Sequence, residues 1–286
     1  MKVGMIGLGP MGRGIAKNIL REFESITIPE HRAKGAVEEL RSLGANVTSV
    51  EGVVGHSSHV LLCLSNGNQV NAILNQNLSR WKTDQVVIDV TTLSKQESLQ
   101  NRAFLKELGV DYIDAPVIRG PKEAQTGTLV TLLGLVDQFH NPTVKKIVSS
   151  YSETIHYFGP ESNSLVVKLL NNYVTCVTST LLIDVIELAR KNAIDLQQMT
   201  NILMSSAARS GTLEKMVLPA LSGDYRGHLF SVENAIKDLD LVSQMMGKQE
   251  PDLASLASLA SSKLNAREHT CDTVLSELLK PLGEYS

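Results

Sequence analysis

The polar residues best suited to chemistry in this chain lie on one predicted helix. The apolar run LVVKLLNNYVTCVTSTLLIDVIELA carries polar side chains at i, i+3, i+4 and i+7, namely Lys168, Asn171, Asn172 and Thr175. A helix brings all four to one face, and the apolar residues around the rest of it predict burial. Burial disfavours the charged form of a lysine and lowers its pKa, which suits Lys168 to proton transfer near neutral pH. The alternative is that the four groups only form hydrogen bonds that fix the helix.

A glycine-rich loop stands near the start of the chain. GLGPMG at residues 7–12 matches GxGxxG, follows the strand-like run VGMI and precedes the helix-like run RGIAKNIL. In that context Gly7 allows a tight turn, Gly9 lets the backbone approach a pyrophosphate, and Gly12 permits close helix packing. The loop and the helix start, including Pro10 and Met11, are therefore predicted to bind a dinucleotide.

The next expected strand, ITIP, ends at Glu30, about twenty residues after the loop. A carboxylate at that place accepts hydrogen bonds from the ribose hydroxyls, which favours NAD. His31 and Arg32 follow directly and suit the 2′-phosphate of the alternative cofactor, NADP.

Two further strand-like runs, HVLLCL and QVVIDV, end at the sheet edge where ligands bind in open α/β folds. The residues that follow them are candidate ribose or nicotinamide neighbours: Leu64, Ser65, Asn66 and Thr92. Ordinary turn formation is the alternative for each.

The elements that must position these residues fall into two regions. Up to about residue 158, the strand-like runs VGMIG, ITI, ANVTSV, HVLLCL, QVVIDV, VDYIDA, TLVTLLG and TIHYFG alternate with amphipathic segments, which predicts a doubly wound, mostly parallel α/β sheet. From Ser162 onward, long helical stretches are broken at Gly211, at residues 223–227 and near Pro251. We therefore expect a Rossmann-type domain over residues 1–160 and an all-helical substrate and dimerisation domain over residues 161–286.

Composition and charge narrow the function classes. The net charge is −3, and acidic and basic residues are interspersed, which disfavours nucleic-acid and membrane partners. The chain opens without a charged leader and apolar export segment, so we expect a cytoplasmic protein. Cys63, Cys176 and Cys271 form no CxxC pair and are expected to be reduced and packed. His56 and His59 lack further ligands, so no metal site is predicted.

Five motifs occur in order along almost the whole chain: GLGPMG, IDVTT, DAPVIRGPKEAQTGTL at 114–129, GPESNSLVVKLLNN at 159–172 and FSVENAIKDLDL at 230–241. Together they resemble the β-hydroxyacid dehydrogenases, which include 3-hydroxyisobutyrate dehydrogenases and tartronate semialdehyde reductases. The resemblance implies that Lys168 is the catalytic acid and base, that Asn172 is its partner, and that Lys237 lies near the nicotinamide. It also implies a homodimer or homotetramer formed through the helical half.

The chain departs from the family pattern at two places. Ser162 and Ser164 stand where glycine is usual before the lysine, and the usual serine-glycine-glycine substrate loop is here Ile118, Arg119, Gly120. Arg119 offers a planar guanidinium to a larger or more strongly acidic anion than usual.

In this loop the chain resembles the bacterial 3-sulfolactaldehyde reductases. The resemblance implies substrate contacts at Arg119, Gly120, Asn171 and Thr175, and a short aldehyde that carries a sulfonate. The alternative for Arg119 is a surface ion pair with Glu123, one turn further along.

These observations predict an NAD(P)-dependent oxidoreductase that interconverts a small hydroxy acid or hydroxy sulfonate and its aldehyde. Two alternatives remain. An imine reductase-like enzyme is one, although those enzymes usually carry another residue at the position of Lys168. The other is a non-catalytic dinucleotide sensor, which would bind NADH without consuming it.

Overall fold

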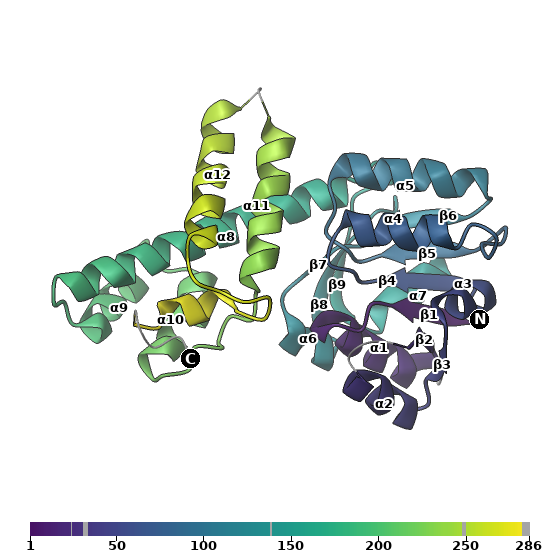
Figure 1. Ribbon diagram of the computed structural model, residues 1–286, viewed down its shortest axis with the longest axis horizontal. Helices are drawn as coiled ribbons and strands as arrows, with labels where there is room; N and C mark the ends of the chain where they lie inside the picture. Colours follow the sequence, from purple (N-terminus) through teal and green to yellow (C-terminus); the bar gives the residue numbers. More distant parts are fainter. Residues whose placement is uncertain (24, 31–33, 138, 248–249, 282–286) are drawn as a thin grey trace. The chain divides into compact units, whose positions relative to one another are not determined.

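The computed structural model of the protein describes residues 1–23, 25–30, 34–137, 139–247 and 250–281 (Figure 1). Its contacts divide the chain into an N-terminal unit, Met1–Lys168, and a C-terminal unit, Leu169–Ser286. The sequence analysis places a boundary at residue 160, just before a long helix, whereas the contacts divide the chain inside that helix.

The N-terminal unit is built on a six-stranded parallel sheet. Its strands are β1 (Val3–Ile6), β2 (Thr27–Pro29), β3 (Asn46–Thr48), β4 (His59–Leu62), β5 (Val86–Asp89) and β6 (Asp111–Asp114), in the order β3-β2-β1-β4-β5-β6. The connecting helices are α1 (Pro10–Phe23), α2 (Lys34–Ser42), α3 (Val50–His56), α4 (Gly67–Gln76) and α5 (Lys95–Glu107). This is the doubly wound sheet that the sequence predicts.

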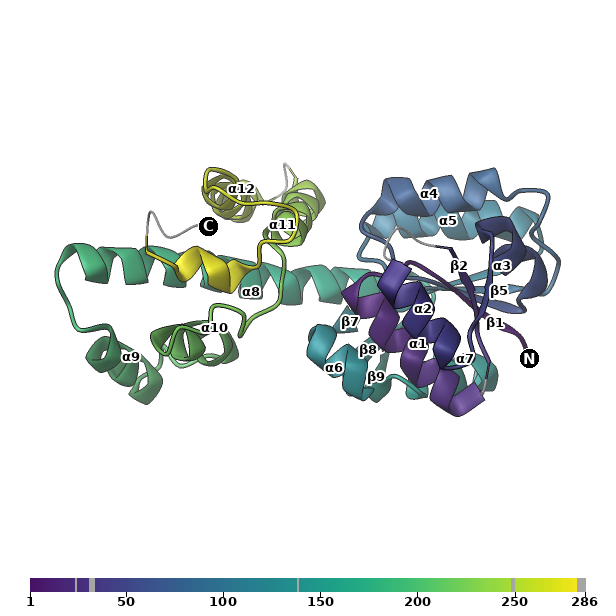
Figure 2. The same cartoon turned by 60° about the horizontal axis from the view of Figure 1, so that its bottom comes forward.

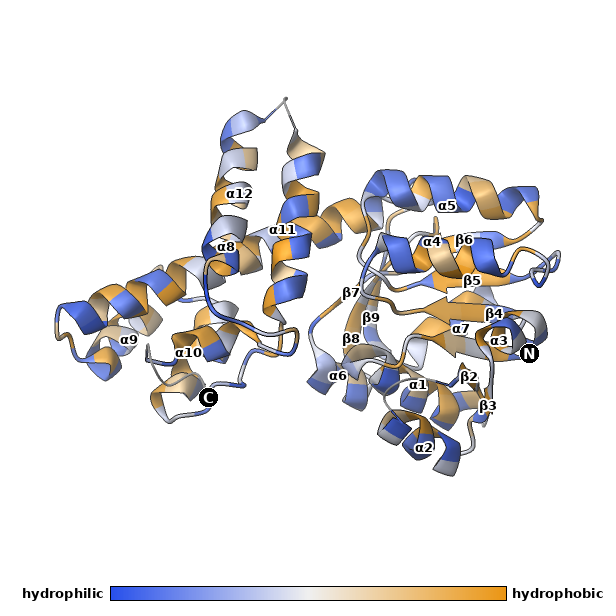
Figure 3. Cartoon of the chain, in the orientation of Figure 1, coloured by the Kyte–Doolittle hydropathy of each residue, from blue (hydrophilic) through white to orange (hydrophobic). Residues whose placement is uncertain are grey.

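Both faces of this sheet are buried, because adjacent strand residues belong to different cores. Met5 packs with residues of α1 such as Ile15, whereas its neighbour Ile6 packs in a separate cluster with Val53 of α3. The central strands β1, β4 and β5 therefore consist mainly of hydrophobic residues, while α4 and α5 combine hydrophobic and hydrophilic residues (Figure 3). This is why the strands appear in the sequence as continuous apolar runs.

A second, three-stranded sheet completes the unit. It consists of β7 (Val117–Ile118), β8 (Leu129–Leu133) and β9 (Ser152–Tyr157), with α6 (Pro121–Thr126) and α7 (Pro142–Ser149) between the strands. β7 and β8 are antiparallel, and β8 and β9 are parallel. The sequence analysis missed β7, because two residues are too few to show a strand pattern.

The described part of the C-terminal unit is helical, as predicted. Its helices are the later part of α8 (Asn163–Lys191), α9 (Leu196–Ser205), α10 (Gly211–Leu221), α11 (Val232–Met246), α12 (Pro251–Asn265) and the short 3₁₀ helix η1 (Leu275–Leu279). Asp195, Ser210 and Ser231 accept hydrogen bonds from first-turn amides and so cap α9, α10 and α11. α11 and α12 lie side by side (Figures 1 and 2).

One expectation for α8 is wrong. Its apolar circumference predicts burial on all sides, yet Val174, Leu181 and Leu188 are 65%, 59% and 61% exposed. The opposite side of the helix, including Cys176 and Ile183, forms the core of the C-terminal unit. α8 is the one described helix whose length and composition would allow it to cross a membrane, a test that core helices of soluble proteins also pass.

Candidate active site

The GLGPMG loop joins β1 to α1 with the backbone geometry that a dinucleotide site needs. Gly7 has a φ of +99°, which favours glycine, and a Cβ added there would overlap the carbonyl oxygen of Cys63. A Cβ on Gly12 would overlap the carbonyl oxygen of Gly7, so α1 lies directly against the turn. A Cβ on Gly9, in contrast, would meet no atom within 4 Å. Open space at Gly9 beside the first-turn amides of α1 fits a pyrophosphate group.

Glu30 lies where the sequence predicts, directly after β2. Its side chain is exposed, and its backbone N–H donates to the carbonyl of Thr48 at 3.0 Å. β2 is the neighbour of β1 in the sheet, so both predicted cofactor segments leave the same edge. His31 and Arg32 lie outside the described residues.

The residues that follow β4 form hydrogen bonds with nearby parts of the chain. Asn66 caps α4, because its side-chain oxygen accepts from the backbone N–H of Gln69 at 3.0 Å. The backbone N–H of Ser65 donates to the side chain of Gln69 at 3.1 Å. The backbone N–H of Leu64 donates at 3.0 Å to the hydroxyl of Thr91, which thereby joins the ends of β4 and β5. Thr91, the neighbour of the predicted Thr92, makes this described link between the strand ends.

Asp89 ends β5 as a buried carboxyl group, only 1% exposed. It accepts from the backbone N–H of Thr91 at 2.8 Å and from the hydroxyl of Tyr112 at 2.6 Å. Burial raises the pKa of Asp89 to about 6, although both hydrogen bonds act in the opposite direction. The sequence analysis assigned no role to this group, which links the ends of β5 and β6 at the predicted cofactor edge.

Arg119 occupies a strained position in the turn between β7 and α6. Its φ is +81°, a conformation that costs a non-glycine residue free energy. The guanidinium donates to the carbonyl of Thr128 and to the carboxylate of Glu153. Glu123 instead accepts from the backbone N–H of Gly120 at 2.9 Å and caps α6. The described ion pair of Arg119 is thus with Glu153 and not with the expected Glu123, and an anion at Arg119 has to compete with Glu153.

Contacts between α1 and α6 fix the position of the Arg119 turn relative to the glycine-rich loop. A Cβ added to Gly14 would lie 2.6 Å from the backbone carbonyl carbon of Ala124, so the two helices touch backbone to backbone. The amide of Asn18 donates to the carbonyl of Ala124 at 2.7 Å and to that of Gly14 at 2.9 Å. The sequence analysis missed both residues, because they look like ordinary members of an amphipathic helix.

The polar stripe on α8 forms as predicted. Lys168 is only 9% exposed and Asn172 only 4%. Asn171 donates from its amide to the side-chain oxygen of Asn172 at 3.2 Å. The hydroxyl of Thr175 donates to the carbonyl of Asn171 at 3.0 Å, which is ordinary helix back-bonding.

Asp238 on α11 orients the stripe within the C-terminal unit. It is 2% exposed, and one carboxylate oxygen accepts from the amide of Asn172 at 2.6 Å. The Nζ of Lys237 lies 3.1 Å from the other oxygen. A buried carboxylate flanked by an amide and an ammonium fixes the direction of Asn172. The sequence analysis named Asp238 without a role, because its partner on α8 lies 66 residues away.

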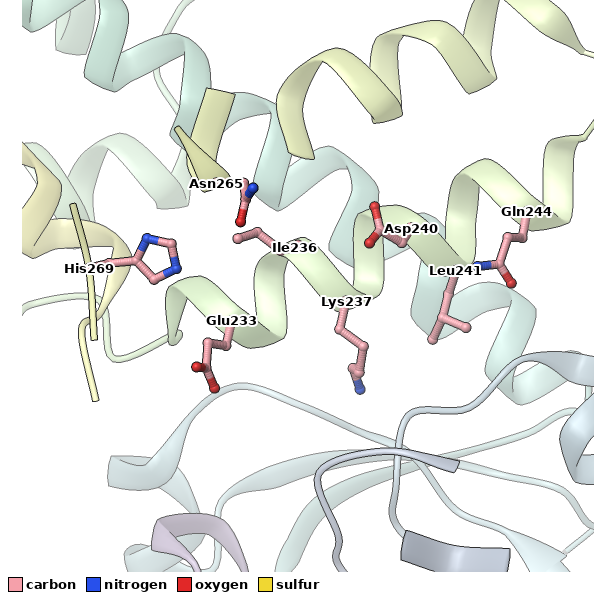
Figure 4. A pocket seen from close by; sticks show the side chains of 8 residues that line it. All are labelled: Glu233, Ile236, Lys237, Asp240, Leu241, Gln244, Asn265 and His269. Carbon is pink, nitrogen blue, oxygen red and sulfur yellow. The ribbon is translucent and has the colours of Figure 1, made fainter. Parts of the chain in front are cut away.

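Lys237 also lines a cavity of about 450 Å³ in the C-terminal unit (Figure 4). Glu233 and Lys237 project from the same side of α11, while Asn265 and His269 come from the end of α12 and the segment after it. The volume lies within the range of small-molecule sites, which are roughly 300–1,000 Å³.

Histidine and cysteine side chains are dispersed. Among the described residues, no three or more His, Cys, Asp or Glu side chains gather as a metal site would require. His56 instead contacts the carbonyl of Gly52 at 2.8 Å. The described cysteines are free, but Cys271 is exposed rather than packed as expected.

Comparison with known proteins covers both units. Residues 2–159 match the family model described as the NAD binding domain of 6-phosphogluconate dehydrogenase. Residues 163–277 match the model described as NAD-binding of NADP-dependent 3-hydroxyisobutyrate dehydrogenase.

Individual relatives cover most of the chain. The chain is 29% identical over 245 residues to a 2-(hydroxymethyl)glutarate dehydrogenase of Eubacterium barkeri, covering 84% of this chain and 81% of the relative. It is 27% identical over 244 residues to a 3-sulfolactaldehyde reductase of Escherichia coli, with the same coverage. The solved structure of a Mycobacterium tuberculosis 3-hydroxyisobutyrate dehydrogenase with L-serine superposes with a TM-score of 0.82, at 21% identity and over 97% of each chain.

Proposed function

The chain belongs to the β-hydroxyacid dehydrogenase family, and we propose that it interconverts a short anionic aldehyde and the corresponding hydroxy acid or hydroxy sulfonate in the cytoplasm. The observation that carries this proposal is the buried polar stripe on α8, with Lys168 at 9% exposure and Asn172 held by Asp238. A buried lysine beside a fixed amide is suited to proton transfer rather than to surface solvation.

The cofactor is a nicotinamide dinucleotide, which supplies or accepts the hydride when it is bound. Gly7, Gly9 and Gly12 would hold its pyrophosphate at the start of α1, since the open space at Gly9 suits close backbone approach. We propose NAD as the preferred form, because the carboxylate of Glu30 would accept from the ribose hydroxyls and repel a 2′-phosphate.

Lys168 is proposed to handle the proton. In reduction its ammonium donates a proton to the carbonyl oxygen as negative charge develops there, and in oxidation its amine takes the proton from the hydroxyl. Asn172 is proposed to hold that oxygen in line, while Asp238 keeps the amide of Asn172 from rotating. The chain thus supplies position and a proton, and no described cluster suggests a metal.

The proposed substrate carries a strongly acidic group, and its recognition rests on Arg119. The guanidinium offers two parallel donors to a sulfonate or carboxylate, which a lysine would not. Its present partner, Glu153, is 55% exposed, so the pair between them is one that a bound anion can replace at low cost. A sulfonated short aldehyde is therefore the preferred candidate, ahead of the semialdehydes of carboxylic acids.

A turnover panel tests this function. Sulfolactaldehyde, succinic semialdehyde, tartronate semialdehyde and methylmalonate semialdehyde are each offered with NADH and with NADPH. We expect turnover of an anionic aldehyde with NADH preferred, and a loss of roughly a hundred- to ten-thousand-fold in kcat for Lys168→Ala. Lys191→Ala, an exposed lysine on the same helix, should leave kcat unchanged.

Arg119→Ala in the same panel tests the substrate class. Loss of a charge-assisted bond should lower kcat/KM for the anionic substrate about ten- to two-hundred-fold, with a smaller loss for an uncharged aldehyde. Equal losses on both would mean that Arg119 supports the loop rather than the anion. NADH binding without turnover of any substrate would favour the sensor alternative, and turnover of cyclic imines alone would favour an imine reductase.

We also propose that the protein is a homo-oligomer that assembles through α8. Val174, Leu181 and Leu188 recur every seven residues and form one exposed apolar stripe. That spacing is typical of helices that pair along a seam, and a second copy presents the same stripe.

A further inference from the structure

Asp114, at the end of β6, is a buried carboxylate that holds the start of α8. It is 1% exposed and forms an ion pair with Arg102 of α5 at 2.7 Å. The hydroxyl of Ser162 donates to one carboxylate oxygen at 3.1 Å, and the hydroxyl of Ser164 donates to the other. Both serines are completely buried. Two residues at the start of α8 are thus bound to one charged group in the sheet.

Two further contacts tie this helix start to α5. The Nζ of Lys95 donates to the side-chain oxygen of Asn163 at 2.9 Å. The hydroxyls of Ser98 and Ser162 lie 2.8 Å apart. Residues 162–164 are therefore held one after another by side-chain bonds to elements of the N-terminal unit.

The backbone conformation of Ser162 indicates that its hydroxyl helps to hold the turn before α8. Its φ is +56°, a conformation in which a serine costs free energy that a glycine would not. Serine at this position therefore strains the turn, and its bond to Asp114 offsets that cost.

Lys168 lies one helical turn after Ser164, on the same face of α8. Fixing the side chain of Ser164 against the sheet therefore fixes the direction from which Lys168 projects. We propose that Asp114 is a positioning residue for Lys168, acting through Ser162 and Ser164. This inference rests on the proposed role of Lys168 in proton transfer.

The test compares serines that bind the same carboxylate from different elements. Ser164→Ala removes a hydroxyl from α8, whereas Ser98→Ala removes one from α5. The Ser98 variant loses the 3.4 Å bond to Asp114 and the contact with Ser162, but it leaves the bonds of Ser162 and Ser164 to Asp114 in place. Both serines are completely buried, so each change removes one buried hydroxyl. Ser162→Gly is a second variant, which relieves the backbone strain but loses the anchor.

Two quantities are measured in each variant: kcat with KM, and the rate at which Lys168 reacts with acetic anhydride, followed by mass spectrometry. For Ser164→Ala and Ser162→Gly we expect about a ten-fold loss in kcat, little change in the KM for cofactor, and faster acetylation of Lys168. Ser164→Thr keeps the hydroxyl and should restore both quantities. Ser98→Ala should change kcat by no more than about two-fold, because the bonds of Ser162 and Ser164 to Asp114 remain.

Equal effects of Ser164→Ala and Ser98→Ala on both quantities would overturn the proposal, as would an unchanged acetylation rate in Ser164→Ala. If the wild-type protein turns over no aldehyde of the panel, the proposed function fails. The acetylation rates need no substrate, so faster acetylation confined to the α8 variants would still show that Asp114 holds Lys168 in place.

Discussion

Among single residues, Asp89 makes the stability of the protein depend on pH. Burial raises its pKa from 3.8 to about 6, so the folded protein keeps a proton that the unfolded chain has lost. The contribution of this group is therefore fully present below pH 3.8 and is lost as the pH rises to 6. A shift of roughly two units corresponds to about 3 kcal/mol in the free energy of unfolding.

Asp89→Asn should remove this dependence. Tyr112 can then accept a hydrogen bond from the new amide instead of donating one, so the contact is retained. We expect the free energy of unfolding of the variant, relative to wild type, to rise by about 3 kcal/mol between pH 4 and pH 7 in urea titrations. The matched control is Asp111→Asn, an exposed carboxyl at the start of β6. A parallel pH profile for wild type and Asp89→Asn would contradict the assignment.

The residues that sequence reasoning could identify are those whose signal is local. Gly7, Gly9 and Gly12 share one loop, and Lys168 and Asn172 share one helix face. The contacts it could not identify join distant residues: Ser162 binds Asp114 across 48 positions, and Asn18 binds the carbonyl of Ala124 across 106. A buried contact of that kind depends on the fold, and the two residues show no regular spacing in the sequence that would reveal it.

Among the elements, the contact between α1 and α6 sets how the cofactor loop and the Arg119 turn are spaced. Gly14→Ala would place a methyl group 2.6 Å from the backbone of Ala124, where no flexible side chain can move aside. We expect about 1–3 kcal/mol of destabilisation from this overpacking, together with weaker NADH binding, measured by thermal unfolding and by titration.

Gly35→Ala is the control for this prediction. A Cβ at Gly35, in α2, would meet no atom within 4 Å, so the change should leave stability equal or slightly higher, as a better helix former does. Equal stability of Gly14→Ala and wild type would show that the two helices can separate without cost.

At the level of elements, the order of strands and helices could be predicted because both faces of the sheet are covered. The exposed side of α8 could not be, since an apolar residue that faces solvent looks the same in sequence as one that faces the core. Val174 and Cys176 stand two positions apart, and only the packing of the other helices separates them.

For the whole molecule, the exposed stripe on α8 predicts self-association. We expect the wild-type protein to sediment as a dimer or larger oligomer, and Leu181→Glu to shift it toward the monomer, because the charge would be buried without a partner. Leu43→Glu changes another leucine, 51% exposed in the N-terminal unit, and should leave the oligomer intact. A monomeric wild-type protein in sedimentation velocity would rule out the assembly proposed here.

The strand order also governs when the sheet can form. Each pair in the six-stranded sheet is parallel, so no hairpin joins two of its strands. One edge of β1 pairs with β2, and the other edge can pair only after β4 has been synthesised, where Val3 aligns with His59. During synthesis, β1 therefore keeps its edge toward β4 unpaired until about sixty further residues have followed it. That edge is apolar on both faces, and an interrupted or slowed translation in this stretch would leave the chain most prone to aggregate.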